Sequence, residues 1–194
     1  MATVRRTLIH PLEGYRSREA GSFLAQMDDQ SRLLLESLKG ITDQELGWQP
    51  SPGTNTMGML LAHLAIVEVF WTQIALRGIQ LGKTETDSIL GIGEDDDGMP
   101  IPENGAPPQK LNGKAPAFYE DLLSRARGYY KADATKLSDA DLDREVTWTN
   151  KEGTIRTINL RWAMYHILEH FSGHYGQILL LRHLCRAAVG SPSR

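Results

Sequence analysis

Three histidines recur at intervals of four residues near the end of this chain, and this spacing constrains its fold more than any other feature. They are His166, His170 and His174, within a run patterned as one long helix. A step of four residues advances about 400° around an α-helix, so neighbouring histidines lie one turn apart on nearly the same face. Two such imidazoles can reach one metal ion. All three cannot, because the outer pair is separated by about 12 Å of rise at roughly 1.5 Å per residue.

Other parts of the chain carry the same helical periodicity, with apolar residues recurring at three and four positions. The four expected long helices span residues 12–39, 57–77, 115–137 and 159–188. A capping-box sequence, Thr42 to Glu45, predicts one additional short turn. Four long helices in a chain of 194 residues predict an all-α four-helix bundle. We find no domain boundary, so residues 1–194 are expected to form a single domain.

Two segments lack helical periodicity. Residues 1–12 are expected to form a loose arm. Residues 82–114 are rich in glycine and proline and include the acidic run 94–97, so we expect a long solvated loop that forms a lid or rim over a site. The acidic run lacks the alternating spacing of a calcium loop. A carboxylate from Asp95 to Asp97 is a minor candidate for a contact with a metal.

A small β-hairpin is expected just before the last helix. Two short β-prone runs, 145–149 and 154–157, flank a turn sequence that ends in Gly153. The hairpin is the expected exception to an otherwise helical fold.

Composition excludes several classes of protein. The net charge of −3 is too small to indicate a nucleic-acid partner, and we find no run of about 18 uncharged apolar residues that could span a membrane. The chain shows no signal-peptide pattern, so we expect a cytoplasmic protein. Cys185 is the single cysteine, which excludes an internal disulfide and a cysteine-based metal cage.

A third metal ligand must come from another helix, because a catalytic metal site commonly uses three protein ligands and keeps a position open. Among the other expected long helices only the second carries a histidine, His63. Bundle cores are where facing helices build such sites. The chain therefore predicts His63 together with one histidine pair from the last helix.

Residue chemistry alone leaves two pairs open. His166 and His170 enclose Glu169 in the H-x-x-E-H form of inverted zinc peptidases. That mechanism also needs a downstream carboxylate ligand, and no acidic residue follows His170. Glycines flank His174 on either side and leave room near its ring, which favours the pair His170 and His174. Asn159 and Glu169 are candidates to orient a ligand histidine.

Two motifs resemble those of the DinB/YfiT-like family of metalloproteins. The first, Met59-Leu-Leu-Ala-His-Leu-Ala-Ile-Val-Glu-Val-Phe-Trp71, is followed about a hundred residues later by Glu169-His-Phe-Ser-Gly-His-Tyr-Gly-Gln-Ile178. The resemblance covers most of the chain. It implies an up-down-down-up bundle, a homodimer, and one divalent metal held by three histidines. The matching residues are His63, His170 and His174, and His166 falls outside the pattern.

The resemblance also implies an activity. Family members are similar to S-transferases that use bacillithiol, mycothiol or glutathione, and to maleylpyruvate isomerase. We therefore expect a metal-dependent enzyme that transfers a low-molecular-weight thiol to a small-molecule substrate, with zinc, nickel or iron as its metal. Glu68 and Tyr175 are candidate groups on the substrate side, although Tyr175 stands where the family often has arginine. The alternatives are a metal-dependent hydrolase and a non-catalytic metal-binding stress-response protein.

Overall fold

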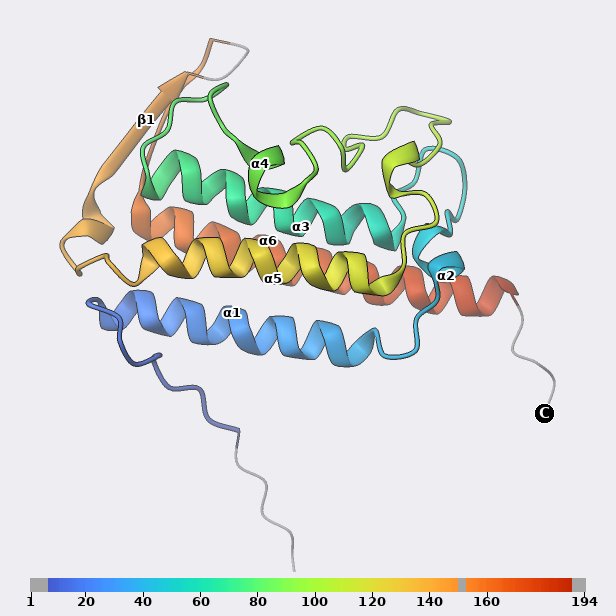
Figure 1. The fold of residues 1–194 in the computed structure, drawn as a ribbon, viewed down its shortest axis with the longest axis horizontal. Coiled ribbons are helices and arrows are strands. Elements are labelled where there is room, and N and C mark those ends of the chain that lie inside the picture. Colours follow the sequence, from blue (N-terminus) through green and yellow to red (C-terminus); the bar gives the residue numbers. More distant parts are fainter. Residues whose placement is uncertain (1–6, 150–152, 190–194) are drawn as a thin grey trace, which may run out of the picture.

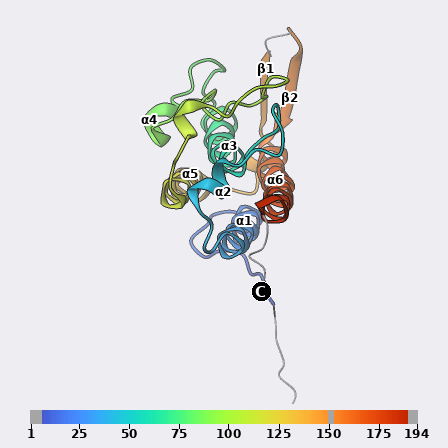
Figure 2. The same cartoon turned by 90° about the vertical axis from the view of Figure 1, so that its right-hand side faces the viewer.

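The computed structural model describes residues 7–149 and 153–189, and four long helices dominate this part of the chain. They are α1 (Arg18–Ser37), α3 (Met57–Trp71), α5 (Pro116–Ala134) and α6 (Leu160–Val189). In Figure 1, α1 and α6 run in one direction and α3 and α5 in the other, which confirms the up-down-down-up bundle. Viewed along the helices in Figure 2, α3 lies across the bundle from α1, with α5 and α6 on either side.

Three of the helices, α1, α2 and α3, begin at residues whose side chains accept hydrogen bonds from free backbone N–H groups. Ser17 accepts from Ala20 N at the start of α1, and Thr56 accepts from Met59 N at the start of α3. Thr42 and Glu45 form the expected capping box of α2 (Asp43–Gly47). The first helix was expected to begin near residue 12 and instead begins at Arg18, because the Ser17 cap sits in an extended conformation with φ −99° and ψ 124°.

The end of α3 departs from regular helix. Residues Thr72–Leu76 form a π-helical turn, in which Arg77 N donates to Thr72 O over 3.1 Å. The expected helix 57–77 is therefore present, but its last turn is wider than an α-helix.

A crossover segment, residues 77–115, connects α3 to α5. The two helices run parallel, so the connection must return along the bundle, and in Figure 1 it passes over α3. It contains the short helices α4 (Thr86–Leu90) and η2 (Gln109–Leu111) and buries Leu90, Ile92, Asp97 and Leu111. The expectation of a solvated loop over 82–114 is wrong for these residues, because short apolar stretches between the glycines and prolines pack onto the bundle.

The predicted hairpin precedes α6. Strands β1 (Glu145–Thr149) and β2 (Ile155–Asn159) pair antiparallel, and their register runs from Glu145 opposite Asn159 to Thr149 opposite Ile155. The turn between them lies outside the described residues. The ring of Trp148, on β1, contacts that of Trp71, on α3, at 5.6 Å between centroids, which joins the hairpin to the bundle.

The prediction that no segment could span a membrane needs correction. Met57–Leu76 is long and apolar enough by length and composition, with a mean hydropathy of 1.7, but 83% of this window is buried inside the protein. Its charged residue, Glu68, pairs with Arg127 on α5. Packing of α3 against α5 and α6 accounts for its apolar character.

Candidate metal centre

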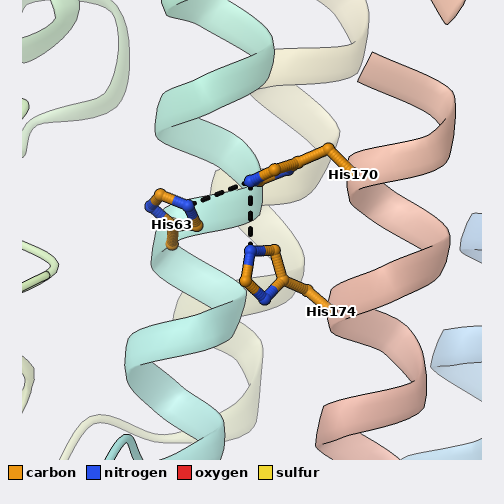
Figure 3. Close-up of side chains that lie close together, drawn as sticks. All are labelled: His63, His170 and His174. Atoms are coloured by element: carbon orange, nitrogen blue, oxygen red, sulfur yellow. Dashed lines mark hydrogen bonds between the residues drawn. The ribbon is translucent and has the colours of Figure 1, made fainter. Parts of the chain in front are cut away.

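The packing of α3 against α6 brings three histidines together. His63 lies in the middle of α3, and His170 and His174 lie one turn apart on α6. In Figure 3, His170 and His174 extend from α6 toward His63 on α3, and dashed lines join His170 to each of the other two rings. Within residues 7–149 and 153–189, this trio is the one group of potential ligands close enough to share a metal ion.

The distances are those of a compact cluster. His170 Nε2 lies 3.0 Å from His63 Nε2 and 3.1 Å from His174 Nε2. One ring nitrogen from each histidine lies within 4.8 Å of the other two. Two nitrogens that each bind zinc at about 2.0–2.1 Å in tetrahedral geometry lie roughly 3.3 Å apart, close to the two short contacts of His170. The cluster therefore has the dimensions of a three-histidine metal site.

Hydrogen bonds among the three rings cannot account for both short contacts of His170 Nε2. An imidazole nitrogen carries either one N–H or one lone pair. His170 Nε2 has two close nitrogen neighbours, so at most one of these contacts is a good hydrogen bond. Three lone pairs directed at one cation account for both short contacts, and the donor set thus fits a bound metal.

The opposite nitrogens of two rings are held by acceptors. His63 Nδ1 lies 2.8 Å from Asp97 Oδ2, and His174 Nδ1 lies 2.8 Å from Gln177 Oε1. A carboxylate and an amide oxygen accept hydrogen bonds, which places the hydrogen on Nδ1 in both rings. The lone pair of each ring is then on Nε2, the atom that faces His170.

Burial favours the neutral form of His170 and His174. Desolvation, and after it the like charge of His174, His63 and His166, together lower the pKa of His170 to about 3. Desolvation also lowers the pKa of His174, against the opposing effect of its hydrogen bond to Gln177. Neutral imidazole is the form that binds metals, so these ligands are ready near neutral pH.

His166 belongs to an aromatic cluster beside the site. Its ring stacks on Trp162 with centroids 4.7 Å apart and an interplanar angle of 9°, and meets the edge of Trp71 at 5.3 Å. Its Nδ1 lies 2.9 Å from Glu169 Oε1. His166 is not part of the histidine trio. Glu169, expected as an acceptor for a ligand histidine, binds His166 instead.

The two substrate-side candidates each have a partner in another helix. Glu68 is 1% exposed, and its carboxylate takes two hydrogen bonds from Arg127 on α5, at 2.5 and 3.2 Å. The Tyr175 hydroxyl lies 2.9 Å from that of Ser37, at the end of α1. Asn159, the other candidate to orient a ligand, accepts from Trp162 N and caps α6. None of these contacts joins Glu68, Tyr175 or Asn159 to the histidine trio.

Sequence reasoning placed Asp97 only among carboxylates that could touch a metal. The structure shows it against the outer nitrogen of His63, not among the potential ligands. No sequence periodicity identifies this contact, because it depends on the path of the crossover segment over α3.

Comparisons with known proteins agree with this architecture. Residues 26–178 match the sequence model of the DinB superfamily. The chain belongs to the DinB superfamily. This confirms the resemblance carried by the two histidine motifs, and membership together with the trio fits a metal-binding protein.

A solved structure supports the fold. A conserved protein from Enterococcus faecalis superimposes with a TM-score of 0.60 at 14% identity, covering 84% of this chain and 94% of that chain. At this identity the likeness concerns the fold alone. No curated protein matches the chain.

Proposed function

We propose that this DinB superfamily protein is a metal-dependent enzyme of the S-transferase type. His63, His170 and His174 hold one divalent ion, and a low-molecular-weight thiol takes an open position on it. The observation that carries the proposal is the convergence of the three Nε2 atoms at 3.0 and 3.1 Å around His170. Three protein ligands leave room for a substrate, unlike a closed structural site with four.

A bound divalent ion would supply the activation of the thiol, because coordination lowers the pKa of a thiol and stabilises its thiolate. The protein supplies the neutral ligands and access. The side chain of His63 remains 19% exposed, and His170 and His174 are half-buried, so a small molecule can reach the cluster.

The carboxylates near these helices support a thiol over water as the nucleophile. Hydrolysis by a metal-bound water commonly uses a nearby carboxylate as general base. The helices α3 and α6 carry one acidic residue each, Glu68 and Glu169. Glu68 is paired with Arg127, and Glu169 with His166. Asp97, from the crossover segment, is paired with the Nδ1 atom of His63, on the side of the ring away from the cluster. A thiol coordinated to the metal loses its proton more easily, so thiol transfer does not need a nearby carboxylate as general base.

A conjugation assay tests this proposal. Purified protein is loaded with zinc, nickel or iron and mixed with chlorodinitrobenzene and one of three thiols: glutathione, mycothiol or bacillithiol. The thiol sulfur displaces chloride, and the thioether is followed by absorbance. We expect a metal-dependent rate with at least one thiol, lost in His170→Ala. His183→Ala, an exposed histidine on the same helix, should keep that rate.

Other results would identify the alternatives. Turnover of a nitrophenyl ester without thiol, and no conjugation, would show a metal-dependent hydrolase. Stoichiometric metal with neither activity would show a non-catalytic metal-binding protein. Absence of metal binding would reject the metal centre itself.

A further inference from the structure

Asp97 is a buried carboxylate that reaches the metal centre from the crossover segment. It is 2% exposed, and its Oδ2 lies 2.8 Å from His63 Nδ1. Its Oδ1 accepts a hydrogen bond from Met99 N at 2.9 Å. We infer that Asp97 is the positioning residue for His63, and that it couples metal binding to the folding of residues 93–99 onto α3. This inference rests on the proposed metal centre.

The first step is orientation. A carboxylate accepts but does not donate hydrogen bonds, so the contact places the hydrogen of His63 on Nδ1 and leaves the Nε2 lone pair toward His170. It also fixes the rotation of the ring about its bond to the helix. Without Asp97, the ring of His63 can rotate or take the other tautomer, and both changes misdirect the ligand atom.

The second step is charge. Asp97 has no lysine or arginine partner among the ion pairs of the described residues; its one ionic contact is with His63. A buried carboxylate is costly unless a cation or hydrogen bonds compensate it. Three neutral histidines leave a bound divalent ion with its full charge. A carboxylate behind one ring reduces that charge, so the ion and Asp97 stabilise each other.

The third step is reciprocity. If the contact of Asp97 with His63 raises metal affinity, bound metal strengthens that contact by the same factor. Residues 93–99 form a compact turn around it. Gly93 N donates to Asp96 Oδ2 at 2.6 Å, and Gly98 N donates to Asp95 O at 3.2 Å. The turn is therefore held to α3 more firmly when the metal is present.

Zinc affinity gives the first test. Full-length wild type, Asp97→Asn and Asp97→Ala compete with a chromophoric chelator for Zn²⁺. We expect both variants to bind zinc about 10- to 100-fold more weakly. Asp95→Asn is the matched control: it makes the same change of charge in the same turn, and Asp95 is exposed. The zinc affinity of Asp95→Asn should stay within about twofold of that of wild type, because solvent and salt screen the charge of an exposed side chain.

Hydrogen exchange gives the second test and separates positioning from simple folding. In wild type, zinc should slow amide exchange in residues 93–99. In Asp97→Ala, exchange in this turn should be faster and independent of zinc. If Asp97 had only a structural role, Asp97→Ala would speed amide exchange by the same factor with and without zinc. The zinc affinity of this variant would then equal that of wild type. If Asp97→Ala does not fold by circular dichroism, Asp97→Asn, which keeps the shape and an acceptor, decides.

The outcomes distinguish this inference from the proposed function. Wild type that binds no zinc would reject the metal centre. Wild type that binds zinc tightly while Asp97→Asn and Asp97→Ala bind it equally well would overturn the role of Asp97 alone. Equal losses in Asp97→Asn and Asp95→Asn would attribute the effect to the general field and would also overturn it.

Discussion

His63 Nε2 lies 3.0 Å from His170 Nε2, although 107 residues separate the two histidines along the chain. One comes from the second long helix and the other from the last. The contact therefore depends on how α3 packs against α6 rather than on either helix by itself.

The metal content of single histidine variants identifies the residues that bind the metal. We expect purified wild type to hold about one divalent ion per chain, and His63→Ala, His170→Ala and His174→Ala to lose it, because each removes one of three converging nitrogens. His166→Ala should keep the ion, since its ring stacks on Trp162. Elemental analysis measures this. Loss in His166→Ala with retention in His174→Ala would place the pair one turn earlier.

Metal removal should lower thermal stability. A ligand that binds only the folded state stabilises it by about 2.7 kcal/mol at a hundred times its dissociation constant. For a domain of this size that corresponds to a Tm shift of roughly 5–10 °C. Calorimetry of the protein with added zinc, and with a chelator, measures the shift. An equal shift in His170→Ala would show that zinc binds elsewhere.

Glu68 is expected to stabilise the folded protein through its ion pair with Arg127. Glu68→Ala leaves the buried guanidinium of Arg127 without its main partner and should cost about 3–5 kcal/mol in the free energy of unfolding. Metal content should not change. Glu36→Ala is the comparison, because Glu36 pairs with Arg32 at the surface, where solvent screens the pair. This substitution should lower the free energy of unfolding much less than Glu68→Ala. Urea unfolding measures both. Lost activity at unchanged stability would instead support a substrate-side role for Glu68.

The metal-free protein should lose stability on acidification. The folded-state pKa of His170 is about 3, below its ordinary value of 6.5. Between these values the unfolded chain binds a proton at His170 and the folded protein does not, so stability falls as pH falls through this window. Urea unfolding at pH 7 and at about pH 4.5 measures the change, which should be larger in wild type than in His170→Gln. Equal changes would contradict the low pKa.

The helices were largely predictable because their signals are local. Ser17, Thr42 and Thr56 cap helices by contacts three residues away, and apolar periodicity marks the buried faces. Extending the first helix back to residue 12 failed because Ser17, in an extended conformation, caps the helix and ends it there. The π-helical turn after Trp71 has no recognised sequence signal. The up-down-down-up directions of the four helices were predicted from the family resemblance, because periodicity does not determine topology.

The trio of the site was predictable in part. An interval of four placed His170 and His174 on one face, and His63 was the one histidine on the other expected long helices. Spacing could not exclude His166, whose position outside the trio follows from its stacking on Trp162. Asp97 could not be assigned, because a non-periodic segment gives no register against α3. Contacts of this kind depend on tertiary packing alone.

The position of α6 at the end of the described chain has a consequence for biosynthesis. His63 leaves the ribosome more than a hundred residues ahead of His170. Until His170 and His174 have been synthesised, the nascent chain contains one of the three histidines of the trio. The pair on α6 can form as soon as that helix does, but the full set requires α3 to dock against it. Loading of the proposed metal centre therefore requires α3 and α6 to be docked against each other.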